Sequence, residues 1–164
     1  MSLNDKDTPR ALLSLLDRLI DEDPENQVEL PPTPTEALDR LREGVRRDVE
    51  ALLNTRERCR GWPDVFGEID ESVVGYGIPD FSITSIQGGN WRLTVCRQIE
   101  AAIRRFEPRL SMVRVTLPEK GDRLDRSARF RIDALLSADP APEPVSFDTA
   151  LEPTTRRVDV VTGR

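Results

Sequence analysis

Residues 103–117 read IRRFEPRLSMVRVTL, and the interpretation of the whole chain starts from them. Up to Phe106 the apolar residues recur every three or four positions, which indicates a helix, and from Leu110 onward they tend to alternate, which indicates a strand. Pro108 stands between the two patterns and disfavours helical geometry at Glu107. The stretch therefore predicts a helix that ends in a stiff corner and continues as a strand.

The tripeptide Glu107-Pro108-Arg109 places two opposite charges at that corner. The helix dipole disfavours a carboxylate at the C-terminal end of a helix, whereas Arg109 offers a planar fork suited to bidentate recognition. We interpret the corner as a docking site: Glu107 and Arg109 make charge-assisted hydrogen bonds to a partner, and Pro108 fixes their geometry. The alternative is a structural role in which Arg109 bonds the last carbonyls of its own helix.

Alternation continues from the corner to the end of the chain. The apolar positions fall into four sets: Val113, Val115 and Leu117; Phe130, Ile132, Ala134 and Leu136; Val145, Phe147, Thr149 and Leu151; Val158 and Val160. Short turn-rich connections between such half-buried strands predict a mainly antiparallel sheet of about four strands. Its edge either accepts a strand of another chain or is blunted by arginines and prolines.

Two helices are predicted before the sheet. The first begins at Thr33, which with Glu36 forms a capping box around Pro34. Its apolar stripe is Leu38, Leu41, Val45, Val49, Leu52 and Leu53. The second spans residues 92–106, with Glu100 and Arg104 as a supporting pair. Its expected stripe is Leu93, Cys96, Ile99, Ile103 and Phe106. Helices followed by an antiparallel sheet define an α+β fold.

A short leucine-rich helix is predicted upstream, ending at Ile20 and capped by Thr8 with Pro9 in its first turn. An acidic, proline-rich linker follows it, so residues 1–32 form an N-terminal unit and residues 33–164 form the α+β domain. A helix this short is marginal alone in water. It either binds a groove on a partner or folds back on its own domain. The candidate partner-binding residues are Leu12, Leu15, Leu16 and Leu19.

Composition narrows the classes of function. The 164 residues carry a net charge of −6, which argues against binding to nucleic-acid phosphates. The chain has no histidine, so the commonest general base and metal ligand are missing. We interpret Cys59 and Cys96 as reduced thiols. No apolar run approaches the roughly 20 residues of a membrane span. No signal peptide opens the sequence. We expect a cytoplasmic protein with no catalytic site, cofactor or metal.

Between the two helices, residues 54–90 show only a weak periodicity, which indicates a bend or loop.

Three motifs along the chain resemble those of a known family. The motifs are Leu52-Leu53-Asn54-Thr55-Arg56, then Tyr76-Gly77-Ile78-Pro79-Asp80-Phe81, then Phe106-Glu107-Pro108-Arg109-Leu110. In this order, and followed by several short strands, they resemble TssE, a baseplate subunit of the bacterial type VI secretion system. TssE is in turn similar to the small wedge protein of contractile phage-tail baseplates.

The resemblance implies a non-enzymatic structural role. Such proteins lie in the baseplate wedge beside TssF, TssG and TssK. Their fold is similar to the handshake part of a sheath subunit, and they offer strands on which the TssB and TssC sheath builds. Glu-Pro-Arg is the family's signature, linked to docking on the core helical bundle of the wedge. By position it carries over to Glu107, Pro108 and Arg109.

Two other functions remain open. A lysozyme-like glycoside hydrolase acting on peptidoglycan would need two carboxylates, one on either side of a glycosidic bond. Glu107 would be one of them, and Glu68 or Asp80 could be the other, but aromatic residues that could line a sugar site make up only 5% of the chain. The other alternative is a cytosolic regulatory module, unrelated to secretion, that binds its partner through the helix Leu12–Ile20.

Overall fold

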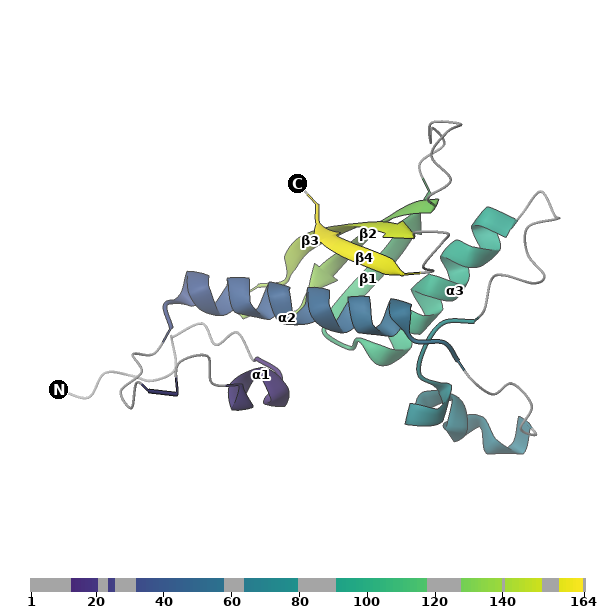
Figure 1. The fold of residues 1–164 in the computed structure, drawn as a ribbon, viewed down its shortest axis with the longest axis horizontal. Helices are drawn as coiled ribbons and strands as arrows, with labels where there is room; N and C mark the ends of the chain where they lie inside the picture. The colour runs from purple at the N-terminus through teal and green to yellow at the C-terminus, as the bar shows by residue number, and fades with distance from the viewer. Residues whose placement is uncertain are drawn as a thin grey trace.

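Helices come first in the chain and a four-stranded antiparallel sheet follows, so the predicted α+β fold is confirmed (Figure 1). The computed structural model describes residues 13–20, 24–25, 32–57, 64–79, 91–117, 128–139, 141–151 and 157–163. Its elements are α1 (Leu15–Leu19), α2 (Pro34–Asn54), the short 3₁₀ helices η1 (Asp64–Glu71) and η2 (Val73–Gly75), α3 (Trp91–Phe106), β1 (Leu110–Thr116), β2 (Ala128–Leu136), β3 (Glu143–Leu151) and β4 (Val158–Thr162).

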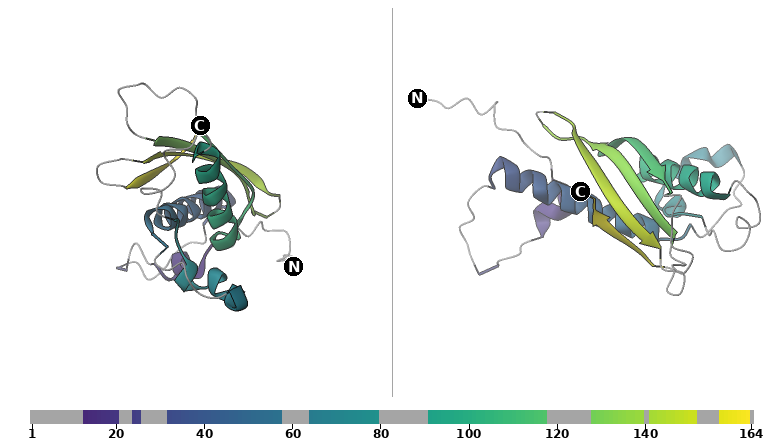
Figure 2. Two further views of the ribbon diagram at one scale, coloured as in Figure 1. Left: turned by 90° about the vertical axis from the view of Figure 1, so that its right-hand side faces the viewer. Right: turned by 90° about the horizontal axis from the view of Figure 1, so that it is seen from above.

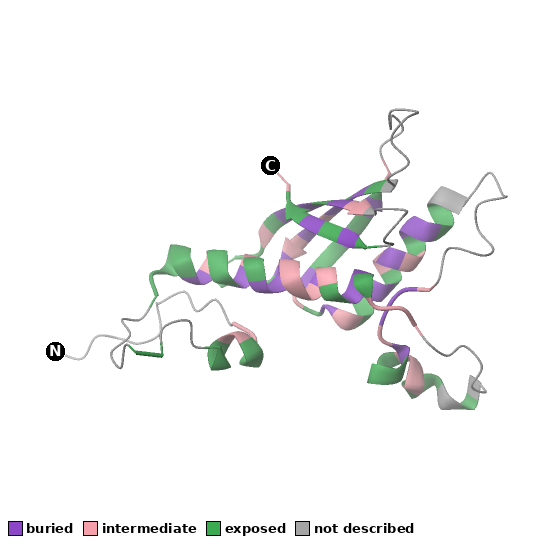
Figure 3. Ribbon diagram, in the orientation of Figure 1, coloured by how far each residue is buried: buried purple, intermediate pink, exposed green. Residues whose placement is uncertain are grey.

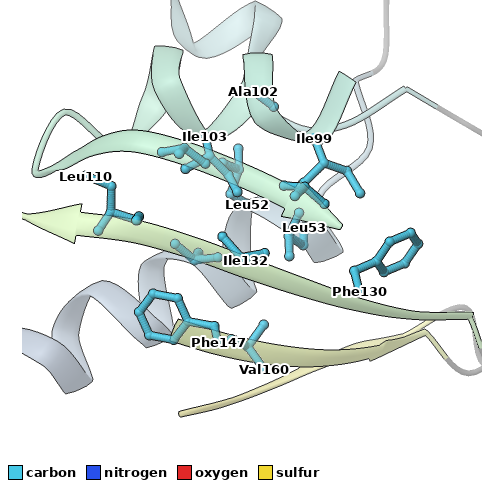
Figure 4. Packing of buried hydrophobic residues seen from close by; sticks show 14 of the residues in the cluster. Leu52, Leu53, Ile99, Ala102, Ile103, Leu110, Phe130, Ile132, Phe147 and Val160 are labelled. Atoms are coloured by element: carbon cyan, nitrogen blue, oxygen red, sulfur yellow. The ribbon is translucent and has the colours of Figure 1, made fainter. Parts of the chain in front are cut away.

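The sheet is a meander in which each strand pairs with the next one in sequence. Helices α2 and α3 both lie under one face of it, so the domain has two layers (left view of Figure 2). Because side chains alternate along a strand, the apolar set of each strand points into the space between the layers. Figure 4 shows this core, in which Ile132, Phe147 and Val160 of the sheet meet Leu52 and Ile103 of the helices.

Helix α2 begins as the sequence predicts. The N–H of Glu36 donates to Thr33 Oγ1 at 3.3 Å, and the N–H of Thr33 donates to Glu36 Oε2 at 2.8 Å, which completes the capping box. The predicted stripe faces the sheet, with Leu41, Val45 and Val49 fully buried. Its period of three to four residues keeps one side of a 21-residue helix on the core along its whole length.

The buried face of α3 differs from the prediction. Leu93 is 58% exposed, whereas Val95 and Ala102, which were not assigned to the stripe, are buried beside Cys96, Ile99 and Ile103. Leu93 satisfies the spacing to Cys96 but lies at the flank of the face that the sheet covers. Helical spacing alone allows two overlapping apolar stripes on α3. Packing against β1 determines which of the two is buried.

Between α2 and α3, the described residues 64–79 are more ordered than the predicted loop. They contain η1 and η2, and Ile78 pairs with Arg56, just after α2, through a parallel bridge. Gly77 has a φ of 125°, and a Cβ at this position would lie 2.7 Å from the carbonyl oxygen of Thr55. Glycine is therefore needed for the close approach of the two segments.

Helix α1 begins later than predicted. Ser14 is its N-cap, and the N–H of Asp17 donates to Ser14 Oγ at 3.1 Å. A serine cap so near the leucines leaves Leu13 outside the helix; Thr8, Pro9 and Leu12 lie outside the described residues. No helix within the described ranges combines the length and apolar character that a membrane span needs.

Truncation to alanine is expected to lower the stability of the domain at Ile103 but hardly at Leu93. Ile103 is fully buried between the layers, so Ile103→Ala should lower the free energy of unfolding by about 2–5 kcal/mol. Leu93→Ala on the same helix should change it by less than about 0.5 kcal/mol, because an exposed side chain loses little on truncation. Urea unfolding followed by circular dichroism measures both. Equal losses would contradict the assigned face of α3.

Candidate functional site

The three sequence motifs that are far apart along the chain meet at one hollow. Its volume is about 310 Å³. Its lining comprises Asp48 and Leu52 of α2, Tyr76 after η2, Phe106 at the end of α3, and the corner Glu107, Pro108 and Arg109. We call this site the docking corner.

Tyr76 is held over the corner by the segment that returns to α2. The N–H of Ile78 donates to the carbonyl of Thr55 at 2.9 Å, and the N–H of Glu57 donates to the carbonyl of Ile78 at 3.1 Å. The Tyr76 ring then meets Phe106 edge to face, with ring centroids 5.2 Å apart. Burial raises the pKa of Tyr76, and the nearby negative charges of Asp48 and Glu107 raise this pKa further.

The corner's charges form a triad with α2. Arg109 Nε donates to Glu107 Oε1 at 2.6 Å and Arg109 Nη2 donates to Glu107 Oε2 at 2.5 Å, which is a bidentate pair. Arg109 Nη2 also donates to Asp48 Oδ2 at 2.6 Å. These hydrogen bonds to Glu107 and Asp48 raise the pKa of Arg109 against the opposing effect of burial. The guanidinium therefore stays charged and fixed.

Glu107 is not displayed to solvent as the sequence suggested. It is only 4% exposed, because the bidentate pair turns inward onto α2, and Pro108 is the exposed member of the tripeptide. Among the described residues, the side chain of Arg109 donates to two carboxylates and not to the last carbonyls of α3. The corner is thus built into the fold, and its role in docking stays a prediction.

One nitrogen of the triad lacks a partner. Arg109 Nη1 is buried and has no hydrogen-bond acceptor among the described residues. A buried donor without an acceptor costs about 1–3 kcal/mol. The corner therefore keeps Arg109 in a position that is not optimal for stability alone, which is a common property of functional sites.

The triad continues to the N-terminal helix. Asp48 Oδ1 also accepts from Arg47 Nη2 at 3.1 Å, and the same nitrogen of Arg47 donates to Asp17 Oδ1 at 2.7 Å. A Cβ on Gly44 would lie 2.7 Å from Asp17 Oδ2, so the glycine makes room for α1. Burial raises the pKa of Asp17, but hydrogen bonds from Ser14 and Arg47 outweigh burial and the net pKa is lowered.

The leucines of α1 point away from the domain. Leu15 is 72% exposed and Leu19 is 73% exposed, and Leu16 is also on the surface (Figure 3). Leu13, just before the helix, packs on the core instead. Helix α1 therefore rests on α2 through a polar contact and leaves an apolar face uncovered by the described residues. The assignment of Leu12, Leu15, Leu16 and Leu19 to a partner stays a prediction.

The carboxylates named for a hydrolase are not gathered into a site by the described residues. Glu107 is bound to Arg109, and Glu68 is exposed on η1. Asp80 lies outside the described residues. Within the described ranges no cluster of three metal-ligating side chains occurs, and Cys96 is a buried free thiol. Cys59 also lies outside the described residues.

A small α+β domain with a rigid charged corner is typical of structural subunits of larger assemblies. The family model of baseplate wedge protein gp25 matches residues 39–141, and the chain belongs to this family. TssE is the type VI secretion homologue of gp25, so the resemblance seen in the sequence is confirmed. The chain therefore has a structural role in a phage-tail-like baseplate. Searches of the curated proteins and of the solved structures gave no match.

Removal of the arginine fork is expected to destabilise the domain. Arg109→Met leaves the buried Glu107 carboxylate without its counter-charge, which should lower the free energy of unfolding by about 3 kcal/mol. The double variant Glu107→Leu with Arg109→Met removes both charges and should recover more than half of that loss. Urea unfolding at pH 7 measures both variants. A loss below about 0.5 kcal/mol for Arg109→Met would show that the triad contributes little to the fold.

The contact of α1 with α2 should depend on pH in one direction. Because the folded-state pKa of Asp17 lies below its ordinary value of 3.8, its contribution is complete above that value and is lost as the pH falls through the lowered pKa. We expect the Leu13 methyl resonances to stay constant from neutral pH down to about pH 5 and to shift below about pH 4.

Asp17→Asn should move those resonances at every pH, with a loss of about 1 kcal/mol that is typical of a partly exposed pair. Asp133→Asn is the matched control, because Asp133 lies on β2 and pairs with Arg131 of the same strand. A shift of the Leu13 resonances between pH 5 and pH 8 in the parent protein would contradict the role of Asp17.

Proposed function

We propose that this chain is the TssE-like wedge subunit of a type VI secretion baseplate and acts in the cytoplasm. In this proposal the docking corner binds the core helical bundle of TssF and TssG, beside TssK, and the sheet meets the TssB and TssC sheath. The observation that carries the proposal is the convergence of the three motifs on one hollow. All three lie within residues 39–141, the range that the gp25 family model matches.

The corner suits the side of a partner helix. Its walls are apolar, with Leu52 and the Tyr76–Phe106 pair, and Pro108 stands exposed at its rim. The charged groups at its base are two carboxylates and one guanidinium, which leaves one net negative charge. A partner that inserts an apolar side chain and places a basic residue beside Asp48 would satisfy both properties. Because the triad is already ordered, little side-chain entropy is lost on binding.

Helix α1 supplies a second contact in this proposal. Its exposed leucines match the pattern of a short amphipathic helix that enters a groove on another protein. Asp17, Arg47, Asp48 and Arg109 form an unbroken line of ion pairs from α1 to the corner. Both contacts are therefore connected through α2.

Docking should be lost when the rim of the corner is changed without disturbing the triad. Pro108→Glu adds a negative charge to an exposed position of a site that is already negative. We expect at least a tenfold weaker affinity for the purified TssF–TssG complex, equivalent to about 1.4 kcal/mol. The free energy of unfolding should fall by no more than about 1 kcal/mol, because Pro108 is on the surface and the loss is limited to the rigidity of its ring. Biolayer interferometry measures the affinity.

Thr35→Glu is the control, because it adds the same charge at the opposite end of α2. It should bind like the parent protein. If Pro108→Glu binds TssF–TssG with unchanged affinity, docking through the corner is wrong. Co-purification from native cytosol then separates the remaining alternatives: recovery of wedge and sheath proteins that depends on Leu15 and Leu19 assigns the contact to α1, and absence of both favours an unrelated binding module.

A further inference from the structure

An acidic and partly apolar surface lies beside the docking corner, on η1 and η2. These two short helices stand on the side of α2 and α3 that faces away from the sheet (Figure 1 and Figure 2). Residues 64–79 contain four acidic residues and no basic residue. Val65, Val73 and Val74 of the same segment are exposed, and the exposed fraction of Val73 is 90%. The segment therefore presents apolar side chains among negative charges.

The geometry of η1 places its exposed residues on one face. In a 3₁₀ helix, residues that are three positions apart lie directly above one another. Val65, Glu68 and Glu71 have this spacing, and all three are exposed. Val73 and Val74 of η2 follow them after one residue. We call these five exposed residues the platform.

Backbone contacts hold the platform in a fixed shape. The N–H of Ser72 donates to the carbonyl of Ile69 at 3.0 Å, and the N–H of Gly75 donates to the carbonyl of Ser72 at 3.0 Å. A Cβ on Gly75 would lie 2.4 Å from the carbonyl oxygen of Asp70, so glycine is needed for η2 to pack this closely on η1. Arg105 Nη1 of α3 donates to the same carbonyl at 3.3 Å. Because the backbone is already ordered, little entropy is lost when a partner covers the platform.

The platform continues directly into the docking corner. Tyr76, which forms one wall of the corner, is the C-cap of η2. Its N–H donates to the carbonyl of Val73 at 3.3 Å, so a single hydrogen-bonded turn joins the exposed valine to the wall of the hollow. A partner that fills the corner beside Tyr76 therefore has the platform next to it.

The basic residues closest to the platform do not neutralise it. Arg105 donates to a main-chain carbonyl of η1 and offsets one of the four carboxylates. Arg56, which pairs with Ile78, is followed at once by Glu57, so these two charges cancel. Glu68 and Glu71 form no ion pair with another described residue. The platform thus keeps a negative charge that a partner can complement.

We propose that the platform binds a helix of the partner that carries basic and apolar side chains on one face. Exposed valines beside unpaired carboxylates complement such a helix in both polarity and charge. A second copy of this chain would bring the same carboxylates, and nucleic acid or an anionic membrane would be repelled by them. The inference deepens the proposed function and rests on it only for the identity of the partner, which would cover the corner and the platform together.

The first experiment titrates the full chain with a model helix and follows its amide resonances by NMR. The probe is a blocked helical peptide of leucine and lysine, and the comparison peptide has glutamate in place of lysine. We expect the lysine peptide to shift the resonances of Glu68, Glu71 and Val73, and the glutamate peptide to leave them unchanged. The double variant Glu68→Gln with Glu71→Gln should bind the lysine peptide at least threefold more weakly, because it keeps the shape of the platform and removes two charges.

Two results of this titration would overturn the platform, whatever becomes of docking at the corner. One is a set of shifts that leaves out residues 65–74. The other is an equal response to the lysine and the glutamate peptide.

The second experiment tests the platform on the proposed partner. Val73→Lys replaces an exposed apolar side chain by a cation, so the affinity for the purified TssF–TssG complex should fall at least tenfold. Val161→Lys is the matched control, because Val161 is also an exposed valine but lies on β4, in the sheet. It should bind like the parent protein. Both variants should unfold at the same urea concentration as the parent, since neither valine is buried.

Failure of the platform and failure of the proposed function give different results. If Pro108→Glu weakens binding to TssF–TssG and Val73→Lys does not, the corner stands and the platform is overturned. If the parent protein does not bind the complex at all, the proposed partner is wrong, and the peptide titration decides on the platform. Self-association of the parent protein that Val73→Lys abolishes would assign the platform to a second copy and would overturn the basic partner helix.

Discussion

The pairing of Arg109 with Glu107, extended to Asp48, fixes how the helical layer and the sheet meet. Arg109 leads into β1, Glu107 directly follows α3 and Asp48 lies in the C-terminal half of α2, so one guanidinium joins three elements at a single point. Apolar burial drives the layers together but does not set their angle, because it has no direction. The bidentate fork has fixed geometry and supplies that direction.

A buried ion pair of this kind is not an efficient source of stability. Its desolvation offsets much of the Coulomb attraction, and an apolar replacement of similar volume is often as stable. The unpartnered Nη1 of Arg109 adds to the cost. The value of the triad is instead positional: it holds Pro108 at the surface, orders the walls of the hollow, and connects through Arg47 to the helix α1. A preformed corner suits a subunit that must be recognised in one orientation.

Local patterns in the sequence predicted much of the fold. The capping box of α2 and the alternation of β1 to β4 depend on neighbours a few residues apart, and both are confirmed. The burial of Glu107 depends on Asp48, which is 61 positions from Arg109, and nothing in the sequence near the corner indicates that partner. The hydrogen bonds between Asn54 and Val158 escaped prediction for the same reason, since the two residues are 104 positions apart. The burial of Val95 was not predicted because two apolar stripes overlap on α3, and their spacing does not indicate which one faces the sheet.

The meander order of the sheet also sets an order of folding. Each of β1 to β3 pairs with the strand that follows it, so these contacts close short loops and can form as the chain grows. The bonds of Arg46 and Asn54 to β4 join residues 114 and 104 positions apart, so they form only when β4 is in place. Until then β3 is an exposed edge of the sheet, and the nascent chain is most open to wrong pairing before β4 has joined it.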